Sequence, residues 1–307
     1  MSAATPALFQ RHTAVLLIAL LGCAFAGNHI SARLAFDHGT GLLVAIVCRS
    51  GVTMLALLGV VLWQREALRL PRGAWPWQLA VGLLIATQSL CLYSAVARIP
   101  VALALLVSNT LPVVLALLTW ALGGPRPTRR ASVLMGVILL GLVLALDVPT
   151  RLASMEAAGP GPQWGQGIAF AAGAALAFAM ALWITDHKLK ALRGSVRSLM
   201  TLSIVFVAML LAGWSGAVPG GMAWPHDAPG WTGLGLLVLL YGTAFSVMFI
   251  TLPRLDMARN AAVMNSEPIA TLLFGWLILG QRLGALQVLG GLVVVGGIVL
   301  LTTSKAR

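Results

Sequence analysis

RIPVALALLVSNTLPVVLALLTWALGGPR (residues 98–126) pairs without a gap with RLDMARNAAVMNSEPIATLLFGWLILGQR (residues 254–282), 156 positions (254 − 98) further along the chain. Coincident Leu, Ala or Val residues would mean little in so apolar a sequence. The alignment also pairs residues that are infrequent here: Arg98, Asn109, Pro112, Trp120, Gly124 and Arg126 meet Arg254, Asn265, Pro268, Trp276, Gly280 and Arg282. The two segments therefore indicate an internal repeat.

Both copies belong to a series of apolar runs that reaches almost from end to end. Hydrophobic residues make up 59% of the 307 residues and charged residues 9%, against about 45–50% and about 25% in a soluble domain. Runs of this size fit transmembrane helices. We count ten, at residues 13–36, 42–63, 78–97, 100–122, 131–146, 166–187, 199–217, 231–252, 257–279 and 285–303.

The expected fold is all-α and integral to a membrane. Ten helices divide into five at residues 1–146 and five at residues 166–307, joined by an external linker at 147–165. Because five is odd, the second half enters the membrane from the side opposite to the first. We therefore expect two inverted five-helix repeats, an arrangement typical of secondary transporters.

Charge predicts the orientation. Most of the 20 Lys and Arg residues fall in connections on the side of the N-terminus, and the opposite side holds only Arg33, Arg98, Arg151 and Arg282. Since positive loops stay in the cytoplasm, we expect a multi-pass protein of the cytoplasmic (inner) membrane with both termini cytoplasmic. The basic residues are scattered over short loops, which argues against nucleic-acid binding.

Several other classes find little support. Arg11 and the run after it resemble a secretory signal, but the run continues past Gly27 to Phe36, so we expect a retained first helix. No phosphate-binding G-x-x-x-x-G-K-[ST] loop occurs, and Cys23, Cys48 and Cys91 have no C-x-x-C spacing or neighbouring His. We expect no metal and no cofactor.

At this point the chain resembles the drug/metabolite transporter superfamily, in particular its ten-helix EamA-type exporters. The resemblance rests on Phe25-Ala26-Gly27-Asn28, on Arg49, on the two Asn-x-x-Pro motifs and on Leu279-Gly280-Gln281-Arg282. It implies a carrier that works by alternating access, and similarity to exporters of amino acids. Other metabolites or drugs are the alternative cargo in this superfamily.

The two repeat prolines are candidate hinges. Proline inside a helix lacks the N–H that would bond the carbonyl four residues earlier, so Pro112 and Pro268 should free the carbonyls of Ser108 and Met264. The adjacent asparagines can bond the loosened backbone. Static kinks are the alternative to hinges, which the resemblance would place beside the substrate cavity.

Ionisable side chains inside a membrane helix must face protein or water. Glu267 is a candidate for proton coupling or for contact with a substrate amine, with a structural hydrogen bond as the alternative. For Arg49 a structural role is favoured, since an arginine side chain can extend its charged end toward the membrane surface or donate hydrogen bonds to exposed carbonyls.

The candidate substrate-binding residues are mostly neutral, which suits a small zwitterion or amphipathic solute better than a polyanion. Each could instead serve helix packing. They are Asn28, His29, Gln88, Tyr93, Ser108, Asn109, Trp183, Tyr241, Ser246, Asn265 and Glu267.

Two further classes stay open. Gly213-x-Ser215-Gly216 matches a short pattern of rhomboid-type serine proteases, although the only later histidine, His226, lies in a loop. A channel shares the composition, but an inverted pair of kinks favours a carrier. The expected partners are a small-molecule substrate and the lipid bilayer, the coupling is either uniport or proton antiport, and the chain is a monomer or a homodimer.

Overall fold

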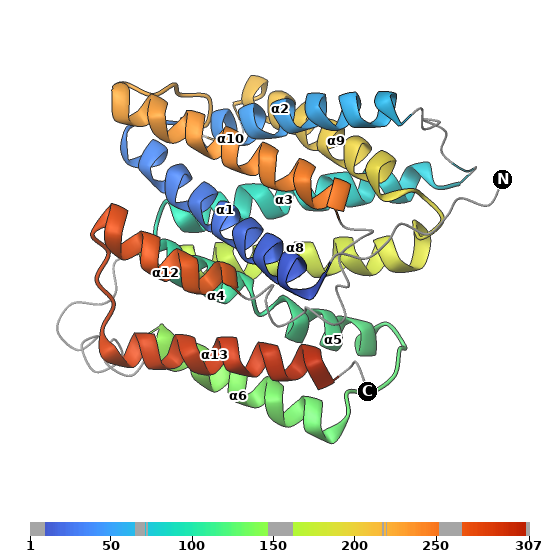
Figure 1. Cartoon of the computed structure of the whole chain (residues 1–307), viewed down its shortest axis with the longest axis vertical. Coiled ribbons are helices and arrows are strands. Elements are labelled where there is room, and N and C mark those ends of the chain that lie inside the picture. Colours follow the sequence, from blue (N-terminus) through green and yellow to red (C-terminus); the bar gives the residue numbers. More distant parts are fainter. Residues whose placement is uncertain are drawn as a thin grey trace.

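The computed structural model describes residues 10–64, 71, 73–146, 162–216, 218, 220–251 and 266–304, and within them it contains helices and no strands (Figure 1). The first half forms α1 (Arg11–Asp37), α2 (Leu42–Trp63), α3 (Trp75–Val96), α4 (Val101–Ser108), α5 (Leu111–Ala121) and α6 (Arg129–Ala145). The second half forms α8 (Pro162–Lys188), α9 (Gly194–Trp214), α10 (Ala228–Thr251), α12 (Ser266–Leu279) and α13 (Ala285–Ser304).

Each of the ten predicted runs coincides with helix, which confirms the all-α membrane fold. Seven described spans are long and apolar enough to cross a membrane, and α12 and α13 are shorter apolar helices. The run predicted at 100–122 is interrupted, because α4 ends at Ser108 and α5 begins at Leu111. Residues 257–265 of the ninth run, and residues 147–161 of the linker, lie outside the described residues.

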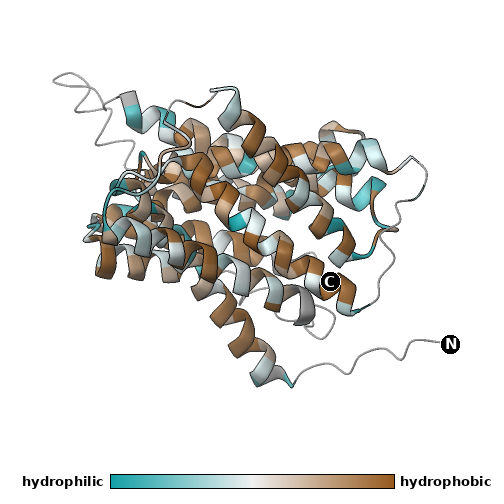
Figure 2. Cartoon of the chain, turned by 90° about the horizontal axis from the view of Figure 1, so that it is seen from above, coloured by the Kyte–Doolittle hydropathy of each residue, from teal (hydrophilic) through white to brown (hydrophobic). Residues whose placement is uncertain are grey.

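The surface of the helix bundle suits a bilayer. Large apolar side chains are exposed along its sides, including Leu16, Leu55, Leu140 and Leu239, and Figure 2 shows brown helices with teal gathered toward the helix ends. Exposed tryptophans lie near both ends of the helices, as in the aromatic belts of membrane proteins. They are Trp63, Trp75, Trp77 and Trp120 at one end and Trp214, Trp224, Trp231 and Trp276 at the other.

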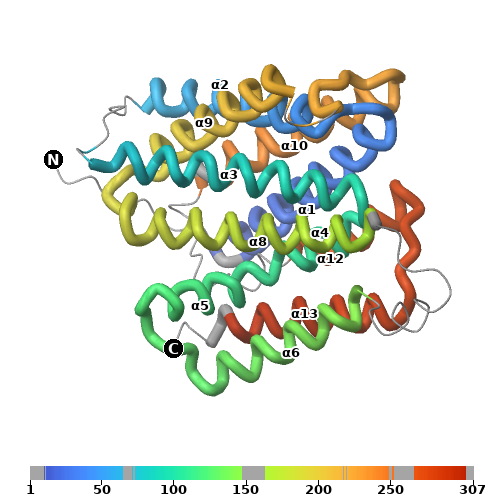
Figure 3. The backbone as a smooth tube through the Cα atoms, turned by 180° about the vertical axis from the view of Figure 1, so that it is seen from behind, coloured from blue at the N-terminus to red at the C-terminus, as the bar shows by residue number. Residues whose placement is uncertain are grey.

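The two halves interleave with two-fold symmetry, as expected for inverted repeats. Matching the halves in chain order pairs α1 with α8, α2 with α9, α3 with α10, α4 and α5 with α12, and α6 with α13. The contact of α3 with α8 then corresponds to that of α10 with α1, and the contact of α4 with α8 to that of α12 with α1. The α2–α9 and α6–α13 contacts are their own counterparts, and Figures 1 and 3 show these pairs side by side.

Helices α6 and α13 approach each other at glycines. A Cβ on Gly290 would collide with the backbone nitrogen of Ala145 and lie 2.6 Å from the carbonyl oxygen of Gly141. Nothing lies within 4 Å of the Cβ position on Gly291. Small residues at membrane-helix contacts allow this close backbone approach.

Gly290→Ala is therefore expected to destabilise the protein by about 1–3 kcal/mol, because the added methyl group meets backbone that no side-chain rotation can relieve. Thermal unfolding in detergent, followed by circular dichroism, measures the loss. Gly291→Ala on the next residue is the control and should leave stability unchanged or raise it by up to about 1 kcal/mol, because its Cβ meets no neighbour and alanine is the better helix former. Equal effects of the two variants would contradict this account of the α6–α13 contact.

One end of the bundle is closed by hydrogen bonds between loops of the two halves. We call it the closed end and define it as residues 38–43, 97–101, 220–227 and 280–284. The backbone nitrogens of Gly41 and Leu43 donate to the carbonyls of Ala223 and Gly221, both at 2.8 Å. The backbone nitrogen of Val101 donates to Gln281 Oε1 at 3.2 Å.

Asp227 belongs to this closed end, where its carboxylate makes two contacts. Its Oδ1 accepts from the Gly230 backbone nitrogen at 2.9 Å in the first turn of α10, and its Oδ2 lies 2.7 Å from His38 Nδ1 at the end of α1. The first contact is the larger cause, and both hold the pKa of the Asp227 carboxyl below its usual range. A depressed pKa means that the carboxylate stabilises the folded state above its unfolded pKa and ceases to do so as pH falls through the folded value.

We expect Asp227→Asn to lower the unfolding temperature at neutral pH. The difference from the wild type should shrink only below about pH 4, as the pH falls through the lowered pKa of the folded Asp227 carboxyl and the wild-type side chain becomes protonated as well. Unfolding temperatures in detergent, measured at about one-unit steps from about pH 2 to pH 8, give the comparison. Asp37→Asn is the control, because Asp37 pairs with Arg33 within the same helix and such exposed pairs contribute little. A difference that persists in acid would count against the role of the Asp227 charge.

Candidate functional site

A cavity of about 460 Å³ lies between the two halves. Its wall takes residues from α1, α2, α3, α4 and α5 of the first half and from α8, α9, α10 and α12 of the second. Much of the wall is apolar and aromatic, with Phe25, Phe178, Tyr241 and Phe245 among the lining residues. Its position matches the midplane site between repeats that transporter folds share.

The cavity occupies only part of the length of the bundle. On α1 and α3 its last lining residues are His29 and Leu92, and on α2 and α10 its first are Arg49 and Tyr241. His29, Arg49 and Tyr241 lie in the middle part of their helices, and Leu92 lies about one turn before the end of α3. The rest of the lining lies toward the end at which α3 and α9 begin. The structure therefore has a cavity on one side of the membrane centre and interlocked loops on the other.

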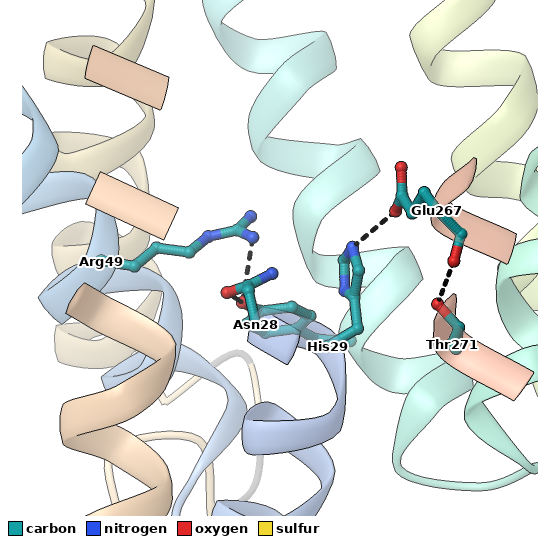
Figure 4. Close-up of polar contacts among 6 residues, drawn as sticks. Asn28, His29, Arg49, Glu267 and Thr271 are labelled. Atoms are coloured by element: carbon teal, nitrogen blue, oxygen red, sulfur yellow. Dashed lines mark hydrogen bonds and ion pairs between the residues drawn. The ribbon is translucent and has the colours of Figure 1, made fainter. Parts of the chain in front are cut away.

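Glu267 and His29 meet across the cavity wall. Glu267 stands in the first turn of α12 and His29 in the middle of α1, with His29 Nε2 at 3.5 Å from Glu267 Oε1 (Figure 4). The side chain of Glu267 is 25% exposed, whereas that of His29 is 8% exposed. Thr271 Oγ1 donates to the backbone carbonyl of Glu267 at 2.8 Å. The Glu267 carboxylate thus lines the cavity while its Oε1 atom stays beside the imidazole of His29.

Arg49 is held on the other side of His29 (Figure 4). It is 5% exposed, and it donates to Tyr93 Oη at 2.9 Å and to Ser89 Oγ at 2.8 Å. Its guanidinium carbon lies 4.4 Å from the ring centres of both Tyr93 and Tyr241. A basic side chain of the first half, Arg49, and an acidic side chain of the second half, Glu267, therefore line the same cavity.

The break between α4 and α5 also faces the cavity. The backbone nitrogen of Asn109 donates to Leu105 at 2.8 Å, but that of Thr110 turns to Val107 at 3.1 Å, and helical bonding resumes from Thr110. Pro112 at the start of α5 has no N–H for the carbonyl of Ser108. Both Ser108 and Asn109 line the cavity. The predicted kink is a full interruption, and whether it moves stays a prediction.

The second candidate hinge is described in part. Pro268 is buried in the first turn of α12, while Asn265 and Met264 lie outside the described residues. In the second half, the segment equivalent to the break at Asn109 is therefore described only from Ser266 onward.

The structure brings six of the sequence-predicted binding residues to the cavity: His29, Gln88, Ser108, Asn109, Tyr241 and Glu267. Asn28 and Tyr93 stand behind the wall, where Tyr93 Oη donates to Asn28 Oδ1 at 3.4 Å. Trp183 does not line it and stacks on His187 at 4.3 Å between ring centres. Ser246 does not line it either.

Sequence reasoning missed a polar group on α9. Arg197, Ser198 and Thr201 line the cavity. Arg197 precedes the predicted run at 199–217, so the sequence placed it in a connection on the side of the N-terminus. Helix α9 begins at Gly194, five residues (199 − 194) before the predicted start, so Arg197 and Thr201 share one helical face. Gln78 Nε2 donates to the Arg197 carbonyl at 3.3 Å and to Thr201 Oγ1 at 2.9 Å. The i, i+4 spacing of Arg197 and Thr201 was the available signal.

The protease pattern finds no catalytic pair in the described residues. Ser215 Oγ donates to the Ala212 carbonyl at 3.0 Å in the last turn of α9. The His226 backbone nitrogen donates to the carbonyl of His38 at 3.2 Å, at the closed end. No contact between the Ser215 and His226 side chains is recorded among these residues.

An interleaved pair of inverted repeats around a midplane cavity defines the class of secondary-transporter folds. The chain belongs to the EamA-like transporter family, whose family model matches residues 12–146 and again residues 165–303. A solved structure described as "Crystal structure of protein" superimposes with a TM-score of 0.58 over 96% of both chains at 19% identity, which supports the fold alone. No match to a curated protein was found.

Proposed function

We propose that this protein exports amino acids or related small metabolites across the cytoplasmic membrane by alternating access. The observation that carries the proposal is the cavity between the halves, with the Glu267 carboxylate in its wall. A cavity volume of about 460 Å³ falls within the range of about 300–1,000 Å³ of small-molecule sites. The carboxylate supplies a contact for the ammonium group of the solute.

The rest of the wall favours a small and partly apolar solute. Gln88, Ser108, Asn109 and Thr201 offer hydrogen bonds, and the other polar contacts are separated by aliphatic and aromatic side chains. A polyanion would require several convergent Arg or Lys residues. The described wall contains Arg49 near mid-membrane and Arg197 nearer the end of the bundle at which α9 begins, so the two do not form one anion site.

Alternating access follows from the repeats. In the predicted orientation, with both termini cytoplasmic, the closed end is external and the cavity reaches into the cytoplasmic half. Exchanging the arrangements of the two halves would close the cytoplasmic end and open the other, since inverted repeats can adopt each other's conformations. The Pro112 and Pro268 breaks are the proposed hinges, and the linker at 147–165 divides the proposed units 1–146 and 166–307.

The aromatic wall supports a second candidate cargo within the same family. Tyr241 lies 6.2 Å from Phe25 and 5.3 Å from Phe245, measured between ring centres. An amphipathic drug could stack on these rings, with its cationic group near Glu267. The proposed activity in both cases is transport without chemical change of the solute, in agreement with the family, and no cofactor takes part.

Purified protein in liposomes tests the proposal. A panel of radiolabelled amino acids should show uptake that is accelerated by unlabelled amino acid on the far side, because a carrier exchanges solutes and a pore does not. Repeating the assay with an imposed pH gradient distinguishes proton antiport from uniport. Flux of lipophilic cations without flux of any amino acid would reject the amino-acid proposal in favour of the drug candidate.

A further inference from the structure

We infer that Arg49 is the binding residue for a carboxylate group of the transported solute. Arg49 lines the cavity, and the inference rests on the proposed transport function because it names the class of solute. Sequence reasoning had favoured a structural role for this arginine. The following contacts point to a binding role.

The charge of Arg49 has no partner of opposite charge among the described residues. Arg49 lies in the middle of a membrane-spanning helix and is 5% exposed. No carboxylate lies within ion-pair distance of it among the described residues; the three recorded ion pairs join His29 to Glu267, Arg33 to Asp37 and His38 to Asp227. Buried charges in proteins are normally paired. An anion that enters the cavity would complete the pairing.

Neutral side chains hold the guanidinium of Arg49 in a fixed orientation. Tyr93 and Tyr241 approach it with their ring faces, and Tyr93 Oη and Ser89 Oγ each accept one hydrogen bond. A guanidinium has five N–H donors, and these two bonds use one on each terminal nitrogen. The group is thus fixed in orientation by neutral partners and retains donors for a bidentate contact. Such planar pairing with a carboxylate is the particular strength of arginine.

Glu267, the acidic residue of the described cavity wall, lies apart from Arg49. Figure 4 shows Arg49 and Glu267 on opposite sides of His29, and Glu267 has its own contact with His29 at 3.5 Å. The acid therefore does not neutralise the arginine. A solute with a carboxylate and an ammonium group matches both charges, whereas a simple cation leaves Arg49 unpaired. The solute class is an amine that also carries a carboxylate, such as an α-amino acid.

The test compares pairs of ligands that differ only at the carboxylate. Full-length protein in lipid nanodiscs is titrated with phenylalanine, phenylalaninamide, leucine and leucinamide. The wild type should bind each acid at least about tenfold more tightly than its amide, because a charge-assisted contact with arginine is lost in the amide. Arg49→Gln should bind acid and amide within about twofold of each other, and Arg49→Lys should keep part of the preference.

Controls separate binding from folding. Arg98→Gln should preserve the wild-type preference, since Arg98 lies outside the cavity, donates to the Ser94 carbonyl at 2.8 Å and faces Phe170 at 4.9 Å. If Arg49→Gln fails to fold, Ser89→Ala and Tyr93→Phe each remove one bond that orients the guanidinium. Each should reduce the preference for the acid by about threefold or more. An unchanged preference in both would overturn the inference.

Two further ligands keep this inference distinct from the proposed function. 3-Phenylpropionate and 4-methylpentanoate carry the carboxylate and lack the amine. If they bind the wild type and lose binding in Arg49→Gln, while phenylalanine and leucine do not bind, the arginine site stands and the amino-acid proposal fails. If amides bind the wild type as tightly as acids, or no carboxylate binds at all, the assignment of Arg49 is wrong.

Discussion

If the proposed function is right, Glu267→Gln is expected to lower the rate of amino-acid transport in liposomes by at least about tenfold, because it removes the charge proposed to contact the ammonium group of the solute. Glutamine preserves the size of the side chain and can still accept a hydrogen bond. The geometry predicts little cost to folding, since the Glu267 side chain is 25% exposed to the cavity and bonds no backbone donor among the described residues. Initial rates of radiolabelled uptake provide the measurement.

Thr271→Val is the matched control on the same helix. Thr271 lies one turn beyond Glu267 and donates to its backbone carbonyl at 2.8 Å, so valine removes a neighbouring polar contact and leaves the carboxylate in place. We expect its transport rate to stay within about twofold of the wild type. A tenfold loss in Thr271→Val, or wild-type rates in Glu267→Gln, would mean that the charge of Glu267 does not act on the solute.

The same variant also distinguishes the two modes of coupling. If Glu267 exchanges a proton for the solute ammonium, an imposed pH gradient should accelerate uptake by the wild type and leave Glu267→Gln unaffected. If the protein is a uniporter, the gradient should affect neither, although the variant should still be slow. His29, at 3.5 Å from Glu267, is the other titratable side chain in contact with this carboxylate among the described residues.

The fold could be predicted from the sequence because a bilayer restricts the choices. Every backbone polar group in the hydrocarbon must be bonded within its own segment, so ten apolar runs define ten helices with few alternatives. The paired Asn-x-x-Pro motifs supplied the repeat, and an odd number of helices in each half supplied the inversion. The interleaved packing, with α3 on α8 and α10 on α1, depends on side-chain fit and could not be inferred from apolar runs.

The candidate site was harder to predict, because a polar residue in a membrane helix does not reveal whether its side chain points into the cavity or toward a neighbouring helix. Asn28 and His29 are neighbours in sequence, yet only His29 lines the cavity, since successive helical residues point about 100° apart. Tyr93 was a candidate as a neutral polar residue of a membrane helix, but its hydroxyl accepts a hydrogen bond from Arg49 behind the wall. Arg197 was missed because α9 begins before its apolar run. Helix phase and helix ends both require the packed structure.

Pro112→Ala is expected to slow solute exchange by about tenfold, because alanine restores the N–H that can bond the Ser108 carbonyl and lets α4 and α5 join into one helix. Proline in a helix interior costs about 3 kcal/mol, and half of that free energy, applied to the barrier between the two conformations, corresponds to about tenfold in rate. A continuous helix would also move Ser108 and Asn109 away from their present positions in the cavity wall. Substrate binding should weaken as well.

Counterflow and net flux measured on the same liposomes identify the affected step. If the break is a hinge, Pro112→Ala slows both measurements while its unfolding temperature stays equal to or above that of the wild type, since alanine is the better helix former. Pro76→Ala is the control: Pro76 lies in the first turn of α3, where a missing N–H has no helical partner in any case. If both variants transport at the wild-type rate, the interruption at Asn109 is a static feature and the conformational change must come from rigid movement of whole helices.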